Sequence, residues 1–167
     1  EVMKLKPKNY KKPILIAEIG CNHMGDMSIA KKMILELKKS GIKYVKFQKR
    51  NNKILLSKKE YNKPHPVPEN SYGKTYGEHR NFLEFNLKQH RELQRYCKSI
   101  SINYSSSVWD WKSTKEIISL NTSYIKVPSA CNLNFKILKL LRDNYKGEIH
   151  ISFGMTTPKE ENEIITF

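Results

Sequence analysis

Short apolar runs alternate with longer amphipathic segments along this chain, and that alternation limits the possible folds more than any other feature. Residues 14–19 are almost continuously apolar and are followed by Gly20, as expected of a strand buried on both faces. A helix is then predicted from Ser28, and Gly41 stands where a C-terminal cap belongs. The apolar face of that helix consists of Ile29, Met33, Ile34 and Leu37.

The same strand–helix unit recurs towards the end of the chain. Further strands are predicted at residues 43–48, 102–107, 124–127 and 149–152. Further helices are predicted at residues 78–99, 113–120 and 134–145, and a last one begins at Thr157 and Pro158. Strict alternation of this kind predicts an α/β protein with parallel strands.

Residues 49–77 form a long polar connection within this pattern. The segment carries Pro64, Pro66 and Pro68 together with many charged residues. Connections of this length are usually functional or disordered. We predict a mobile lid or a subunit contact that has no regular element of its own.

Polar residues at the strand ends favour a barrel over a doubly wound sheet. In a barrel, the chemistry gathers at the carboxyl ends of several strands. The glycine spacing in residues 20–25 does not match the GxGxxG motif of a doubly wound nucleotide-binding fold. We therefore expect a partial (β/α)8 TIM barrel with about five βα units and parallel strands. The polar strand-end residues are Glu18, Lys46, Gln48, Ser106, Ser107, Lys126, Ser129 and Ser152.

The formal net charge of +15 is compatible with a nucleic acid, an anionic membrane or a phosphorylated substrate as partner. Lysines far outnumber arginines and are scattered, which disfavours nucleic-acid binding because arginine supplies most bidentate base contacts.

Cys21, Cys97 and Cys131 lack the spacing of a disulfide framework or a zinc site. The first apolar run is too short for a membrane span. We expect a cytoplasmic protein without a nucleic-acid or membrane partner.

Two lysines at strand ends suggest an anionic ligand. Lys46 and Lys126 close strands that face the expected barrel axis, where a lone ammonium group is poorly hydrated. An anion offsets that cost, and Ser129 and Ser152 add hydroxyl donors. This set suits a small molecule with a phosphate and a carboxylate. The alternative is that both lysines turn outward to solvent.

Glu18 lies within an apolar run, where an ionised carboxylate needs a cationic partner or a raised pKa. Either condition makes it a candidate acid or base. A structural pair with Lys46 on the neighbouring strand is compatible with that role.

Successive motifs of the chain resemble the signatures of the N-acetylneuraminate (sialic acid) synthase family, in the family's order and spacing. The resemblance implies a metal-dependent barrel that condenses phosphoenolpyruvate with an N-acetylated hexose such as N-acetylmannosamine. The products would be a sialic-type nonulosonic acid and phosphate. The motifs are Ala17-Glu18-Ile19-Gly20 with Asn22-His23 and Gly25, then Lys46-Phe47-Gln48, then Lys126 with Ser129 and Asn132, then Ser152 with Gly154-Met155.

The same resemblance implies roles for individual residues. Lys46, Lys126, Ser129 and Ser152 would hold the phosphate and the carboxylate of phosphoenolpyruvate, and Glu18 would be the catalytic carboxylate.

For the acceptor sugar, Gln48 and Ser107 correspond to residues near it, and Asn22 and His23 match the family's first loop. For His23, a role as a hydrogen-bonded loop residue is the alternative.

Two departures leave the acceptor sugar open. Ala130 and Cys131 stand where many members carry Gly-Glu, whose glutamate faces the acceptor. Trp109-Asp110 replaces the Phe-Ser of some members. Both departures indicate an acceptor related to those of known members, and they leave its identity open.

We expect residues 1–167 to be the N-terminal portion of a TIM-barrel sialic acid synthase domain, because a closed barrel needs eight βα units and about 250 residues. The resemblance implies that the manganese or magnesium ligands, and an antifreeze-like C-terminal domain that completes the partner's site in a homodimer, lie elsewhere. His65, His79, His90 and His150 show no ligand spacing and are expected at surface or packing positions.

We expect this segment by itself to be inactive. A catalytically dead phosphate-binding remnant is the alternative, and a basic nucleic-acid-binding protein is a less favoured one.

Overall fold

The computed structural model describes residues 13–167, and its centre is a single sheet of five parallel strands in the order β1-β2-β3-β4-β5. Each strand pairs with the next one in the chain, so that every connection advances the sheet by one strand, as in the wall of a barrel. The predicted barrel-type α/β fold is confirmed, and β1 and β5 lie at the edges. The strands are β1 (Ile16–Gly20), β2 (Tyr44–Lys49), β3 (Asn103–Val108), β4 (Tyr124–Val127) and β5 (Glu148–Ile151).

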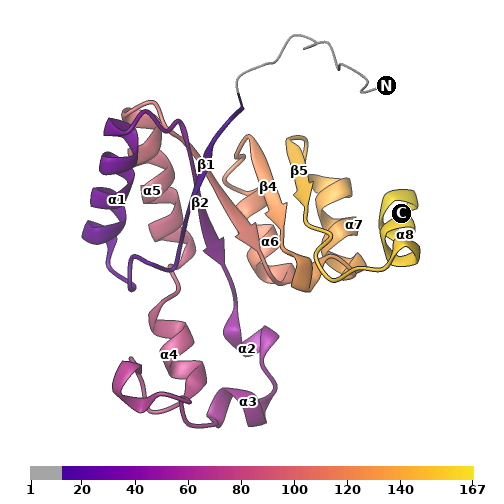
Figure 1. The fold of residues 1–167 in the computed structure, drawn as a ribbon, viewed down its shortest axis with the longest axis horizontal. Helices are drawn as coiled ribbons and strands as arrows, with labels where there is room; N and C mark the ends of the chain where they lie inside the picture. The colour runs from indigo at the N-terminus through magenta and orange to yellow at the C-terminus, as the bar shows by residue number, and fades with distance from the viewer. Residues whose placement is uncertain (1–12) are drawn as a thin grey trace, which may run out of the picture.

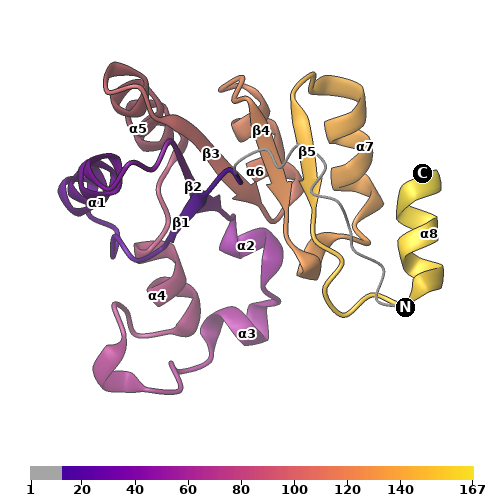
Figure 2. The same cartoon turned by 45° about the horizontal axis from the view of Figure 1, so that its top comes forward.

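Helices follow the strands and lie along the sheet (Figure 1). Figure 2 shows α8 beyond α7, at the far side of β5. The helices of the repeating units are α1 (Met27–Lys39), α5 (Leu87–Ser99), α6 (Trp111–Ile118), α7 (Phe135–Asn144) and α8 (Pro158–Thr166).

The two faces of the sheet differ in polarity because successive side chains of a strand point to opposite faces. Val45, Phe47, Ile125 and Val127 belong to one face and are completely buried in the core shared with the helices. The residues between them belong to the other face. There, the ladder pairs Glu18 with Lys46 and Ser107 with Lys126.

Helix α1 shows how local sequence sets the boundaries. The Asp26 side chain accepts hydrogen bonds from the backbone N–H groups of Ser28, at 2.6 Å, and Ile29, at 3.1 Å, so the helix begins slightly before the predicted Ser28. At the other end, Gly41 has φ +80° and its N–H donates to Lys38, while the N–H of Ile42 donates to Leu37. These two bonds form a Schellman motif, which confirms Gly41 as the cap.

The prediction that residues 49–77 contain no regular element is wrong. Two short helices, α2 (Asn52–Leu55) and α3 (Lys58–Asn62), precede the 3-10 turn η1 (Pro68–Asn70). Helix α3 begins with a capping box between Ser57 and Glu60, a local signal that outweighs the polar composition. Figure 1 shows α2, α3 and α4 (Tyr76–Phe82) together beyond the carboxyl end of β2. The lid or subunit-contact role of this segment stays a prediction.

The prediction of a single helix over residues 78–99 is also wrong. The segment divides into α4 and α5, and Asn86 caps the second of them through a reciprocal pair of hydrogen bonds with Gln89. The break turns Phe85 into the core, where it is only 2% exposed. Helix α6 similarly begins before the predicted Ser113, because Asp110 accepts from the N–H of Lys112 at 3.0 Å.

Gly25 should be more sensitive to substitution than Gly41, although both have left-handed φ values of +76° and +80°. A Cβ on Gly25 would lie 2.4 Å from the carbonyl oxygen of Phe82, whereas nothing lies within 4 Å of one on Gly41. We expect Gly41→Ala to lower the free energy of unfolding by about 1 kcal/mol and Gly25→Ala by about 3 kcal/mol or more. Urea denaturation measures both, and equal losses would contradict this packing.

Candidate active site

Lys46 lies at the centre of the polar face. Its side chain comes from the middle of β2, is only 7% exposed, and forms a salt bridge with the Glu18 carboxylate on β1. Its Nζ also donates to the Ser107 hydroxyl on β3 at 2.9 Å. The predicted pair of Glu18 and Lys46 is therefore present, and the outward orientation considered for Lys46 is excluded.

Among residues 13–167, the two ammonium groups of this face outnumber the single carboxylate that pairs with them. Burial and, to a smaller extent, the Lys126 ammonium group lower the pKa of Lys46 to about 8. Burial likewise lowers the pKa of Lys126. Two ammonium groups thus share the face with the Glu18 carboxylate. An anion bound beside them would relieve both the desolvation and the repulsion.

The loops after β4 and β5 bring the predicted serines together. Ser129 opens the turn η2 (Ser129–Cys131), and Gly154 approaches it so closely that a Cβ there would lie 2.8 Å from the Ser129 hydroxyl. Asn132 donates through Nδ2 to the carbonyl oxygen of Ser152 at 2.9 Å. The two loops therefore form one continuous edge beyond Lys126.

The loop after β1, which contains Asn22 and His23, stabilises the fold in this structure. Asn22 donates through Nδ2 to the carbonyl oxygen of Ile19 at 3.0 Å and closes the turn after β1. His23 is 2% exposed, stacks on Phe85 with ring centroids 3.9 Å apart, and accepts from the N–H of Gly25 at 3.1 Å. Burial lowers the pKa of His23 to about 4. The loop role considered for His23 matches this geometry, and its contact with substrate stays a prediction.

Gln48 extends the polar set towards the rim, the edge formed by the carboxyl ends of the strands. Its Nε2 donates to Oε1 of Glu18 at 3.3 Å, and its Oε1 accepts from Arg50. Arg50 in turn forms a salt bridge with Glu84 at 3.2 Å and lies over the Trp109 ring at 4.2 Å.

Sequence reasoning missed Arg50 and Glu84. The available signal was that Arg50, one of five arginines in a lysine-rich chain, directly follows a strand end.

Two further residues of the strands lie near this site, and only one of them matches its prediction. Ser106, predicted as one of the polar strand-end residues, has a buried side chain that belongs to the helix-facing side of β3 and not to the rim. His150 pairs with Lys126 in the ladder, and its partial exposure agrees with the surface or packing position expected of it. Its ring stacks on Tyr124 with centroids 4.8 Å apart.

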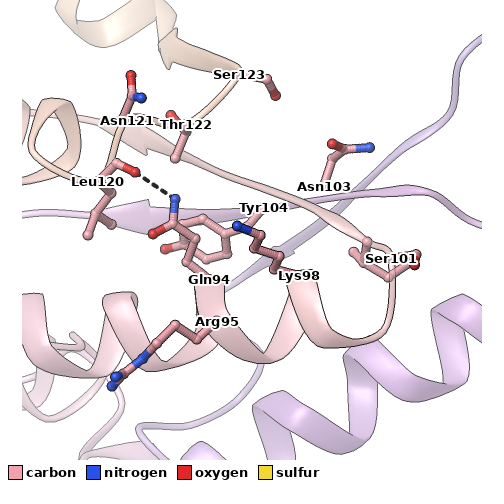
Figure 3. Close-up of a pocket in the computed structure, with 11 residues that line it drawn as sticks. Gln94, Arg95, Lys98, Ser101, Asn103, Tyr104, Leu120, Asn121, Thr122 and Ser123 are labelled. Carbon is pink, nitrogen blue, oxygen red and sulfur yellow. Dashed lines mark hydrogen bonds between the residues drawn. The ribbon is translucent and has the colours of Figure 1, made fainter.

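A cavity of about 720 Å³ lies at the opposite end of the sheet, at the amino ends of β3 and β4. Figure 3 shows its lining of polar side chains, with Gln94 donating to the carbonyl oxygen of Leu120 at 2.7 Å. In barrels, residues at the amino ends of the strands contribute to stability rather than to catalysis. We therefore assign the site to the polar rim and not to this cavity.

Residues 13–167 contain no group of three or more His, Cys, Asp or Glu side chains arranged to hold a metal ion. The resemblance places the ligands of its metal outside this segment, and the described residues offer no ligand set of their own. Within the same range, no helix has both the length and the apolar character of a membrane span.

Comparison with known proteins decides the family. A model described as the NeuB family matches residues 33–167. The chain belongs to the NeuB family. This NeuB-family chain is 37% identical over 151 residues to N-acetylneuraminate-9-phosphate synthase of Drosophila melanogaster, covering 90% of the chain and 40% of the relative.

Two further relatives support the same family assignment. Identity is 40% over 125 residues to the human N-acetylneuraminate-9-phosphate synthase, covering 75% of the chain and 34% of the relative. It is 32% over 155 residues to N,N'-diacetyllegionaminic acid synthase of Campylobacter jejuni, covering 93% and 46%. The chain thus spans less than half the length of the relatives it matches.

Solved structures share the fold. The sialic acid synthetase of Leptospira borgpetersenii, in complex with citrate, superposes with a TM-score of 0.74 at 20% identity, covering 92% of the chain and 48% of that structure. The spore coat polysaccharide biosynthesis protein spsE of Bacillus subtilis gives a TM-score of 0.66 at 23% identity, covering 93% and 40%.

The geometry around His23 predicts a pH dependence of stability. Its pKa is about 4 in the folded protein against 6.5 for an ordinary histidine, so the unfolded chain binds a proton more readily between these values. Stability from this residue is complete above pH 6.5 and is lost as the pH falls towards 4.

His23→Asn keeps an acceptor for the Gly25 N–H but cannot be protonated. We expect the variant to lose roughly 1–2 kcal/mol less unfolding free energy than the wild type between pH 7 and pH 4.5. Urea denaturation at a series of pH values measures the two slopes, and identical slopes would show that His23 is not buried in its neutral form.

Proposed function

We propose that this NeuB-family segment supplies the phosphoenolpyruvate-binding part of a nonulosonic acid synthase. The reaction condenses phosphoenolpyruvate with an N-acylated hexose to give a nonulosonic acid and phosphate. One observation carries the proposal: the ammonium groups of Lys46 and Lys126 share a partly desolvated sheet face with the carboxylate of Glu18. A small, multiply charged anion is the ligand class that such a face favours.

The described residues suit both anionic groups of phosphoenolpyruvate. Lys46 and Lys126 supply charge-assisted hydrogen bonds, and the hydroxyl groups of Ser129 and Ser152 add donors from the adjoining loops. We assign these four residues to the phosphate and carboxylate of the substrate. Their arrangement on β2, on β4 and in the loops after β4 and β5 would fix the enol group near Glu18.

Glu18 is the catalytic carboxylate of this proposal. Its side chain is 45% exposed, so a substrate on the open face of the sheet can reach it. The methylene carbon of phosphoenolpyruvate attacks the sugar aldehyde, whose oxygen takes up a proton and becomes a hydroxyl group, and water adds to the resulting cationic carbon. Phosphate then leaves with cleavage of its carbon–oxygen bond. We assign to Glu18 the acceptance of the proton that the attacking water gives up.

The acceptor is an N-acylated hexose such as N-acetylmannosamine, near Gln48 and Ser107. The somewhat greater identity to the 9-phosphate synthases, 37% and 40% against 32% and 35% for two legionaminic acid synthases, favours a phosphorylated acceptor. We propose N-acetylmannosamine 6-phosphate as the first acceptor to test. A homodimer and a divalent metal site contributed from outside residues 13–167 complete the proposal.

A phosphate-release assay with phosphoenolpyruvate, manganese and N-acetylmannosamine or its 6-phosphate tests this function. We expect turnover by the protein that the complete gene encodes and none by residues 1–167 alone, because the described residues hold no metal ligand set. Lys126→Ala should raise the KM for phosphoenolpyruvate roughly 10- to 100-fold, since it removes charge-assisted hydrogen bonds to a dianion.

Lys146→Ala is the matched control, because it removes the same charge from an exposed position between α7 and β5. It should leave the KM unchanged. A Lys126→Ala enzyme with normal use of phosphoenolpyruvate would refute the assignment. Phosphoenolpyruvate binding without turnover by the complete protein would instead favour the inactive, phosphate-binding alternative.

A further inference from the structure

Arg50 is a buried cation at the rim that the proposed reaction leaves unexplained. It follows β2 directly, and its side chain is only 10% exposed. Its Nη1 lies 3.2 Å from a Glu84 carboxylate oxygen, and its guanidinium group stacks on the Trp109 ring at 4.2 Å. Its backbone N–H donates to the same carboxylate at 3.1 Å. Separating a buried pair of this kind leaves an uncompensated charge, so Glu84 should hold Arg50 in one position.

The fixed guanidinium group determines which way the Gln48 amide faces. The oxygen and nitrogen of a glutamine amide have the same shape, so only the neighbouring groups reveal its orientation. Arg50 contains only donors, and its Nη2 is bonded to Oε1 of Gln48. Ionised Glu18 contains only acceptors, and its Oε1 lies 3.3 Å from Nε2 of Gln48. Both neighbours therefore select the same orientation.

This orientation limits what Gln48 can offer to a ligand. Its carbonyl oxygen is engaged by Arg50, and one hydrogen of its NH₂ group is directed to Glu18. The remaining hydrogen is a donor. We propose that Arg50 is a positioning residue that makes Gln48 a hydrogen-bond donor, so that the acceptor sugar must present an oxygen lone pair beside it. The inference deepens the proposed function and depends on it for the identity of the ligand.

Lysine cannot replace Arg50 in this arrangement. The guanidinium group bonds Glu84 through Nη1 and Gln48 through Nη2 while its flat face lies on Trp109. A lysine ammonium is a single point of charge without a planar fork. Arg50→Lys keeps the charge opposite Glu84 but releases the amide of Gln48.

Steady-state kinetics of the complete protein test the inference. Arg50→Lys should raise the KM for the acceptor sugar about tenfold, the loss expected from one misdirected hydrogen bond, with the KM for phosphoenolpyruvate within about twofold. Arg91→Lys, the same change at an exposed position on α5, should alter neither KM.

A double-variant cycle separates positioning from direct contact. If Arg50 acts through Gln48, Arg50→Lys should have little further effect on the acceptor KM in a Gln48→Ala background. Multiplying effects of the two changes would overturn the inference, and so would an unaffected acceptor KM in Arg50→Lys.

The side-chain amide of Gln48 gives a readout that does not require activity. In ¹⁵N-edited NMR spectra, its NH₂ signals should shift or broaden in Arg50→Lys and stay unchanged in Arg91→Lys. Unchanged Gln48 signals in Arg50→Lys overturn the inference whether or not the protein is a synthase. If Arg50→Lys does not fold, Glu84→Gln, which loosens Arg50 while keeping the shape of its partner, should change the same signals.

Discussion

The free-energy cost of placing the ammonium groups of Lys46 and Lys126 on one partly buried face is the constraint on which the proposed site depends. Their ammonium groups lie on one face of the sheet, where burial disfavours both charged forms and the charge of Lys126 further disfavours that of Lys46. Glu18 pairs with Lys46, and this single carboxylate cannot balance two cations. Within residues 13–167 the charge of this face is therefore not balanced, and our proposal is that a bound anion balances it. Substrate binding, rather than the fold alone, would complete the charge balance.

The fold maintains this arrangement because one face of each strand packs in the apolar core and the other carries the polar site. On β2, Val45 and Phe47 are fully buried against the helices, while Lys46 between them points to the polar face. Moving the strand by one residue would exchange these environments, so the apolar core fixes the register of the site. The segment from α2 to α4 lies beyond the same end of the sheet (Figure 1). Its continuation to Glu84 holds Arg50 and, through it, Gln48.

The sequence contained much of this because the relevant signals are local. The apolar runs predicted the strands, and the carboxylate within the first run predicted the pairing of Glu18 with Lys46. Signals of tertiary origin were missed. The helix break before Asn86 depends on burial of Phe85, and the role of Arg50 depends on Glu84 and Trp109, which are distant in sequence. The capping box of Asn86 and Gln89 is a local signal of the break, whereas no local pattern reveals the contacts of Arg50 with Glu84 and Trp109.

Proton uptake on ligand binding tests the central claim most directly. Titration calorimetry with phosphoenolpyruvate at about pH 8.5, in buffers of different ionisation enthalpy, gives the number of protons bound; the phosphate, with a second pKa of about 6, is already ionised. Because the pKa of Lys46 is about 8 and an anion raises it, we expect net uptake of a large fraction of one proton per ligand. This uptake should fall sharply in Lys46→Met, which leaves only the smaller contribution of Lys126. Binding with no uptake, or with proton release, would contradict the account.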